Sequence, residues 1–75
     1  MFSVLIIDKM EVMFRGKARS AILPGEEGEF EILDFHRDIL SLLREGNIVV
    51  DGSFYPIEKG IMKFCNEELV VVVKR

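Results

Sequence analysis

Short apolar runs separated by turn signals are the feature that most limits the folds open to this chain. Residues 48–50 and 69–73, among others, are rich in β-branched side chains, and such runs at close spacing are typical of all-β proteins. Asp51-Gly52 lies between two β-rich runs and is the strongest hairpin signal in the sequence. Because the chain has 75 residues, it has room for one domain. We therefore predict a single all-β domain over residues 1–75.

The stretch LPGEEGEFEIL at residues 23–33 combines a turn signal, four glutamates and an alternating pattern. From Glu29 onward, Glu29 and Glu31 fall on one face, and Phe30 and Ile32 fall on the other. Successive side chains of a strand point to opposite faces of its sheet. This pattern therefore predicts a half-buried strand with a solvated, acidic outer face.

Other turn signals divide the rest of the chain into candidate strands. Pro24-Gly25 is predicted to end the run at 17–23, and Arg15-Gly16 to end a brief run at 12–14. The last run, at 69–73, is continuously apolar. That composition predicts a strand buried on both faces or covered at an edge of the sheet.

Residues 36–46 fit a helix better than a strand. The apolar residues at 39, 40, 42 and 43 have helical spacing, and Gly46 would make a suitable C-cap. From propensity and periodicity alone we expect a helix of about two to three turns here.

Catalytic chemistry finds little support in the residues. The single cysteine and the single histidine, Cys65 and His36, form the one candidate nucleophile and base for a small hydrolase. Cys65 lies in the alternating stretch GIMKFC, where a cysteine usually packs as a small hydrophobe. The glutamates of a solvent-exposed loop and strand share similar surroundings, so the sequence does not indicate a pair of carboxylates with separate acid and base roles.

Metal and phosphate sites are disfavoured for reasons of spacing and charge. The glutamates lack the aspartate-rich spacing of a calcium loop, and one histidine with one distant cysteine does not make a zinc site. The carboxylates beside Gly25 and Gly28 would repel a phosphate. We therefore predict no catalytic residue, no cofactor and no metal.

The composition favours a protein partner over other ligands. The net charge is −3 without a stripe of Lys and Arg, so nucleic acid is not an expected ligand. The N-terminal apolar run is too short for a signal peptide or a bilayer span. Nearly half of the residues are apolar (49%), and a surplus of apolar surface beside acidic residues suits docking onto a basic partner. The alternative is that the acidic residues are simply solvated.

The order of motifs along the chain resembles the N-terminal β-sandwich domain of the F-type ATP synthase epsilon subunit. That family carries a pattern of the form LPG-x-EGEFG-x-L-PGH, followed by leucines, a turn and an apolar strand. Phe14-Arg15-Gly16, the segment 59–64 and Asn66 resemble further parts of the domain. The central matching residues are Leu23, Pro24, Gly25, Glu27, Gly28, Glu29, Phe30, Leu33, His36, Leu40, Gly46 and Ile48.

The resemblance implies a fold that replaces the helix inferred from spacing. It implies a small flattened β-sandwich or barrel of about 8–10 short strands, with residues 37–43 as a strand. Pro24, Gly25 and Gly28 are then expected to shape a turn. The sequence departs from the family at Glu31, at Asp34-Phe35 and at Lys59. It stops at Lys74-Arg75, before the C-terminal helical hairpin into which family members commonly continue.

The resemblance also implies a mechanical function. The chain would be a non-catalytic rotor subunit that joins the gamma subunit to the membrane c-ring and helps couple ion-driven rotation to ATP synthesis. Glu27, Glu29 and Glu31 are expected to meet the c-ring, and His36, expected at the same end, to meet the ring or gamma. The location would be peripheral, on the cytoplasmic face of a bacterial inner membrane or the stromal face of a thylakoid.

Two alternatives use the same residues differently. The chain could be a free-standing β module that binds some other protein, or the small hydrolase based on His36 and Cys65. In isolation we also expect self-association through the strand at 69–73, if that strand lies at an edge.

Overall fold

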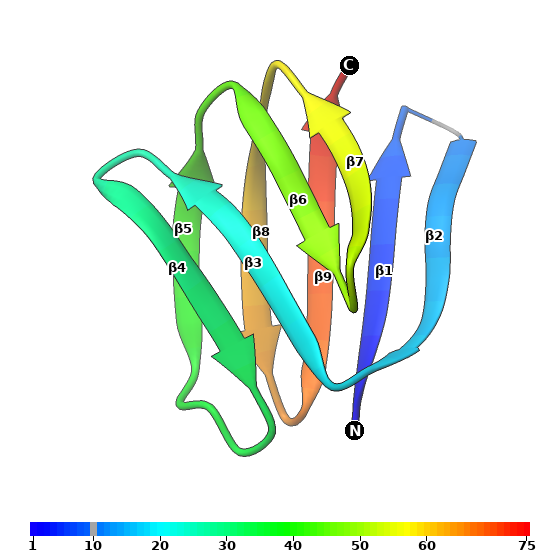
Figure 1. Ribbon diagram of the computed structural model, residues 1–75, viewed down its shortest axis with the longest axis vertical. Helices are drawn as coiled ribbons and strands as arrows, with labels where there is room; N and C mark the ends of the chain where they lie inside the picture. The colour runs from blue at the N-terminus through cyan, green and yellow to red at the C-terminus, as the bar shows by residue number, and fades with distance from the viewer. Residues whose placement is uncertain (10) are drawn as a thin grey trace.

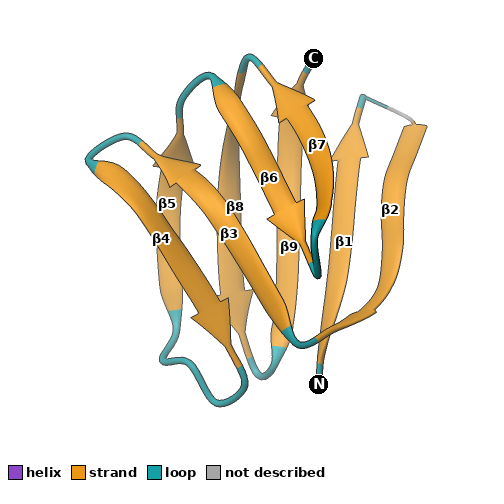
Figure 2. Ribbon diagram, in the orientation of Figure 1, coloured by secondary structure: helices purple, strands orange, loops and turns teal. Residues whose placement is uncertain are grey.

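The computed structural model describes residues 1–9 and 11–75, which form nine β-strands and no helix (Figure 2). This confirms the all-β class and the expected number of short strands. The strands are β1 Phe2–Asp8, β2 Glu11–Ala18, β3 Ser20–Gly25, β4 Gly28–Leu33, β5 Ile39–Leu43, β6 Gly46–Val50, β7 Ser53–Ile57, β8 Lys59–Cys65 and β9 Glu68–Lys74.

The strands form two layers of one folded sheet (Figure 1). The front layer holds β4, β3, β6 and β7, and the back layer holds β5, β8, β9, β1 and β2. The layers are joined where Gly25 of β3 pairs with Leu43 of β5. Phe14 on β2 and Tyr55 on β7 have ring centroids 5.8 Å apart, so the far sides of the layers also meet and the sandwich is nearly a closed barrel.

The core lies between the layers and is made by alternate residues of the strands. Phe2 and Phe64 meet edge to face, with ring centroids 5.6 Å apart, a favourable geometry for aromatic pairs. The buried apolar side chains are Phe2, Val4, Ile6, Ala18, Ala21, Leu23, Ile32, Leu43, Ile48, Val50, Ile57, Met62, Phe64, Leu69, Val71 and Val73.

The segment with helical spacing is a strand, as the family resemblance implied. Residues 39–43 pair in antiparallel register with β8, from Ile39 opposite Phe64 to Leu43 opposite Gly60. Leu40 and Leu42 point outward, away from the core, and are exposed. Cross-strand pairing therefore overrides the local helical preference of these leucines.

The predicted strand end at Pro24-Gly25 is close to the structure, because these are the last two residues of β3 and the turn follows at Glu26-Glu27. The predicted single run at 17–23 is divided, since β2 ends at Ala18 and β3 begins at Ser20. On the side of β3 that faces away from β4, the partner changes here from β6 at Ile22 to β5 at Gly25, so no continuous ladder on that side needs the N–H that proline lacks.

The predicted strand end at Arg15-Gly16 is wrong, because both residues lie inside β2. A Cβ on Gly16 would lie 3.3 Å from the ring of Phe14. The aromatic ring thus covers the glycine and keeps the strand continuous.

β9 also differs from expectation. It lies in the middle of the back layer, parallel to β1 and antiparallel to β8. Its residues alternate between buried and exposed, so it is neither buried on both faces nor placed at an edge. Self-association through an edge at 69–73 is therefore excluded by the topology.

The predicted Asp51-Gly52 hairpin is confirmed. It joins β6 to β7, and both residues have positive φ, 45° and 86°, as a type I′ turn requires. The Asp51 carboxylate accepts hydrogen bonds from the backbone N–H groups of Arg19, at 3.1 and 3.2 Å, and Ser20, at 3.0 Å. One side chain therefore ties this turn to the link between β2 and β3.

Replacing Asp51 with alanine should lower the free energy of unfolding by about 2 kcal/mol, because it removes charged acceptors and places a less tolerant residue at positive φ. Urea denaturation followed by circular dichroism would measure this. Asp51→Asn is the matched control, since asparagine tolerates the left-handed conformation and keeps one acceptor. Equal stability of the two variants would contradict this account of the turn.

Candidate functional site

The outer face of the back layer is unusually apolar for a surface. One row crosses five strands without a polar side chain: Leu42, Ile61, Val72, Ile7 and Val12, each paired with the next. Leu42, Ile61, Val72 and Val12 expose between 42% and 52% of their surface. Contiguous exposed apolar patches on small domains usually mark interaction sites. We call the following set the apolar outer face: Leu5, Ile7, Val12, Leu40, Leu42, Ile61, Val70 and Val72.

Basic side chains flank the apolar outer face. Lys63 lies between Leu40 and Val70 in the cross-strand register, and Arg15 lies opposite Leu5. Lys59 and Lys74 pair across β8 and β9 at one end of the same face. A complementary partner surface would be apolar at its centre and acidic at its rim.

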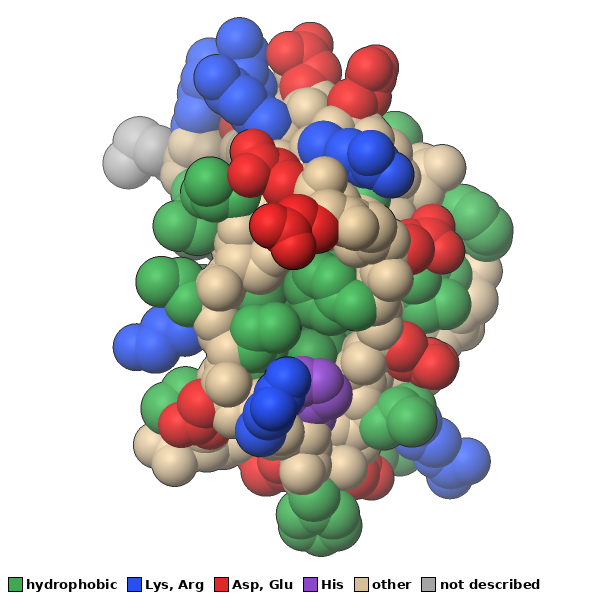
Figure 3. Space-filling model, turned by 90° about the vertical axis from the view of Figure 1, so that its left-hand side faces the viewer, with side chains coloured by type: hydrophobic (Ala, Val, Ile, Leu, Met, Phe, Trp, Pro, Cys, Tyr) green, Lys and Arg blue, Asp and Glu red, His purple; other side chains and the backbone are tan. Residues whose placement is uncertain are grey.

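The predicted acidic residues form a second surface on the other layer. Glu27 lies in the two-residue turn between β3 and β4, and Glu29 and Glu31 are exposed along β4. The Ser20 hydroxyl donates a hydrogen bond of 2.7 Å to Glu31. We call Glu27, Glu29 and Glu31 the acidic strip. Figure 3, which views the molecule from the left-hand side of Figure 1, shows acidic side chains scattered from the top to the bottom of that side.

His36 lies apart from Glu27. The acidic turn precedes β4, whereas His36 follows it in the loop to β5, at the opposite end of the strand (Figure 1). The His36 ring packs edge to face on Phe64, with centroids 5.9 Å apart, and its Nδ1 lies 2.7 Å from the carbonyl oxygen of Arg37. The expectation that His36 and the acidic turn share one end is therefore wrong.

The candidate hydrolase pair is not assembled. The Cys65 thiol lies 3.6 Å from a carboxylate oxygen of Asp38, and His36 has the Arg37 carbonyl as its neighbour. Within residues 1–9 and 11–75, no cluster of three or more His, Cys, Asp or Glu side chains is placed to hold a metal ion.

Gly25 and Gly28, both expected to shape the turn, are required for different structural reasons. Gly28 follows Glu26-Glu27 with φ of +136°, a conformation that favours glycine. A Cβ on Gly25 would lie 2.7 Å from the carbonyl oxygen of Gly28 and 2.8 Å from the Phe30 ring. Gly25 therefore allows close packing inside β3, and only Gly28 serves the turn through its φ.

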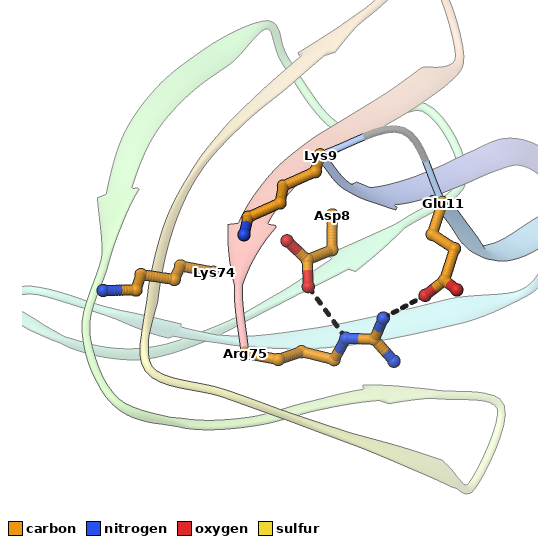
Figure 4. Close-up of a pocket in the computed structure, with 5 residues that line it drawn as sticks. All are labelled: Asp8, Lys9, Glu11, Lys74 and Arg75. Atoms are coloured by element: carbon orange, nitrogen blue, oxygen red, sulfur yellow. Dashed lines mark hydrogen bonds and ion pairs between the residues drawn. The ribbon is translucent and has the colours of Figure 1, made fainter.

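A charged cluster at the end of β9 was missed by sequence reasoning. Arg75 donates a hydrogen bond of 2.9 Å to Asp8 and another to Glu11 (Figure 4). These bonds, the one to Asp8 first, raise the pKa of Arg75 above its ordinary value. The cluster ties β9 to the hairpin of β1 and β2. Arg75 lies 64 to 67 positions from its two partners in the sequence, so no local pattern predicts the cluster.

Comparisons with known proteins show which family the chain matches. The family model of the ATP synthase delta/epsilon chain β-sandwich domain matches residues 1–75. The ATP synthase epsilon chain of Campylobacter lari is 32% identical over 99% of this chain and 61% of its own length. The epsilon chain of Sulfurimonas denitrificans is 32% identical over 84% of this chain and 52% of its own length.

A solved structure agrees in fold. A chain in the central stalk and c-ring structure of the Tetrahymena thermophila mitochondrial ATP synthase superposes with a TM-score of 0.80 at 12% identity, covering 97% of this chain and 63% of that chain. The present chain thus spans about half to two thirds of the length of these relatives. Across the residues that the structure describes, no helix could serve as a membrane span. By its family match over residues 1–75, the chain belongs to the ATP synthase delta/epsilon chain β-sandwich family.

Proposed function

We propose that this chain is a non-catalytic rotor component of an F-type ATP synthase, joining the gamma subunit to the c-ring of the membrane. It would act peripherally, on the cytoplasmic face of a bacterial inner membrane or the stromal face of a thylakoid. Membership in the delta/epsilon family supports this proposal. The structural observation that carries it is the five-strand apolar row on the free outer face of the back layer.

The gamma subunit is assigned to the apolar outer face. Protein interfaces commonly have an apolar centre and a polar rim, and this face supplies both, with Leu42 and Ile61 near its centre and Lys59 and Lys74 at one end. The His36 ring packs on Phe64, whose side chain is buried in the core, so His36 lies on the core side of the back layer and not on the apolar outer face. Its contact with the ring or with gamma stays a proposal based on the family resemblance.

The c-ring is assigned to the acidic strip. Glu27, Glu29 and Glu31 are exposed on one strand and its preceding turn, where they would attract basic or polar groups on the ring. Because Ile32 of β4 and Phe64 of β8 are both buried in the shared core, the two surfaces are joined through close-packed side chains. Such interiors have low compressibility and transmit strain, which is what a coupling component requires.

The assembly can be tested by mixing the chain with its cognate gamma subunit and c-ring on a sizing column. We expect the chain to co-elute with gamma alone, and with the ring more firmly when gamma is present. Absence of co-elution with gamma at low salt would reject the rotor assignment. A free-standing module that binds some other protein would then be the better explanation.

Reversing the charge of the acidic strip should weaken ring attachment. The double variant Glu27→Lys, Glu29→Lys should lower ring affinity by about tenfold to a hundredfold at low ionic strength, with a smaller difference at high salt because exposed charges are screened. Binding measurements at several salt concentrations would show this. The control is Glu11→Lys, Glu68→Lys, which changes net charge equally at exposed sites on β2 and β9 of the back layer. An equal loss in both variants would indicate a net-charge effect and contradict a local contact.

A further inference from the structure

The loop between β4 and β5 holds an aromatic side chain in an unusual state. Phe35 exposes 88% of its surface, more than any other large hydrophobic residue described. Its φ is +64°, a left-handed backbone conformation that is a genuine outlier for a bulky residue. Glycine would adopt this conformation without strain and would expose no apolar ring to water. The folded chain therefore carries two unfavourable features at one residue.

The backbone of this loop is fixed, although the Phe35 ring is free. The Phe35 N–H donates to both carboxylate oxygens of Glu67, at 3.0 and 3.1 Å. Asp38 meets the thiol of Cys65 at 3.6 Å, and the His36 ring packs on Phe64. The loop is thus held in one conformation by side chains from outside it, which is how strained residues persist in folded proteins.

These three contacts reach the same part of the fold. Phe64 and Cys65 belong to β8, and Glu67 lies in the turn from β8 to β9. The loop also leads directly into β5, which carries the exposed Leu40 and Leu42. Phe35 is therefore held in a fixed position relative to the back layer, and with it to the apolar outer face.

Resting on the function proposed above, we propose that Phe35 is an aromatic anchor that inserts into an apolar socket of the gamma subunit, and that Glu67 is its positioning residue. Binding hot spots are often aromatic side chains that enter pockets of the partner. Pre-ordering such a side chain reduces the entropy lost on association. The strained backbone and the Glu67 hydrogen bonds both keep the Phe35 side chain pre-ordered.

The first test separates stability from binding. Phe35→Gly should raise the melting temperature by about 5 °C, because glycine relieves the positive φ, and should weaken gamma binding by at least about tenfold. Phe35→Ala keeps the backbone strain, so it should weaken binding without that thermal gain. Phe54→Ala is the control: Phe54 is exposed on the outer face of the front layer, and its loss should leave gamma affinity unchanged. Calorimetric titration with cognate gamma would measure all three.

The second test addresses Glu67. Glu67→Ala should weaken gamma binding several-fold, and Glu67→Gln should restore much of it, since the amide oxygen can accept the Phe35 N–H. In the Phe35→Gly background, Glu67→Ala should no longer affect gamma affinity, because there is no ring left to position. A purely structural role for Glu67 would give the same loss in both backgrounds.

The outcomes are distinguishable. If the wild-type chain binds gamma and Phe35→Gly binds equally well, the anchor is overturned while the rotor proposal stands. The anchor is also overturned if Phe35→Gly lowers affinity for the isolated c-ring and leaves gamma binding intact. Failure of the wild-type chain to bind gamma would overturn both proposals. No rise in melting temperature for Phe35→Gly would overturn the strain on which the inference rests.

Discussion

Replacing Phe64 with alanine is expected to lower the free energy of unfolding by about 3–5 kcal/mol, the usual range for a buried phenylalanine. Phe64 is 1% exposed and packs against Phe2 at 5.6 Å and His36 at 5.9 Å between ring centroids. A domain of this size has a total stability of roughly 4–11 kcal/mol. The substitution therefore removes a large fraction of the folding free energy, and the variant should unfold at a clearly lower urea concentration than the wild type.

Urea denaturation followed by far-UV circular dichroism would measure the loss at Phe64. The matched control is Phe54→Ala, which removes the same atoms from a side chain that is 66% exposed. It should cost less than about 1 kcal/mol, since surface substitutions have small effects. Similar losses for the two variants would show that the core is not centred between the layers as described.

Placing charges on the apolar outer face is expected to abolish gamma binding while leaving the fold intact. Ile61 and Val72 lie directly opposite each other on β8 and β9, so Ile61→Glu with Val72→Lys creates a cross-strand pair of opposite charges. Both side chains are partly exposed, 42% and 44%, which limits the structural cost. Gamma affinity should fall at least about a hundredfold, because two charges would be desolvated at the centre of the contact.

The front layer supplies an equivalent control. Val49 and Phe54 are paired on β6 and β7, and Val49→Glu with Phe54→Lys places the same charges on the opposite outer face. Calorimetric titration should show near wild-type gamma affinity for this control. Thermal melting would establish that both double variants remain folded. If the front-layer variant lost gamma binding and the back-layer variant did not, the two faces would have to be exchanged in the assignment.

Local signals predicted the parts of the fold that depend on neighbouring residues. Asp51-Gly52 formed the expected turn because its conformation needs residues that tolerate positive φ. The alternation at 29–32 gave the correct strand, with exposed glutamates and a buried Ile32. Residues 39–43 required the family resemblance, since helical spacing and strand pairing compete there and the partner strand lies far away in sequence.

The candidate surfaces were only partly accessible from sequence for the same reason. The acidic strip comes from one short stretch in which every other residue is a glutamate, so a local pattern predicts it. The apolar outer face depends on a register that places Ile7 beside Val72, which no local pattern reveals. Phe35 was noticed only as a departure from the family motif. Its exposure and positive φ depend on Glu67, which the β8 to β9 turn brings to it.

The parallel pairing of β1 with β9 has a consequence for how the chain must fold. β1 is synthesised before the other described strands; one neighbour, β2, follows it directly, but its other neighbour begins at residue 68. Because β9 also separates β1 from β8, the back layer cannot close until nearly the whole segment has been synthesised. Folds dominated by such distant contacts form slowly. During translation the nascent chain should therefore leave apolar strands unpaired, and a chaperone holding residues 2–7 would protect the molecule at its most aggregation-prone stage.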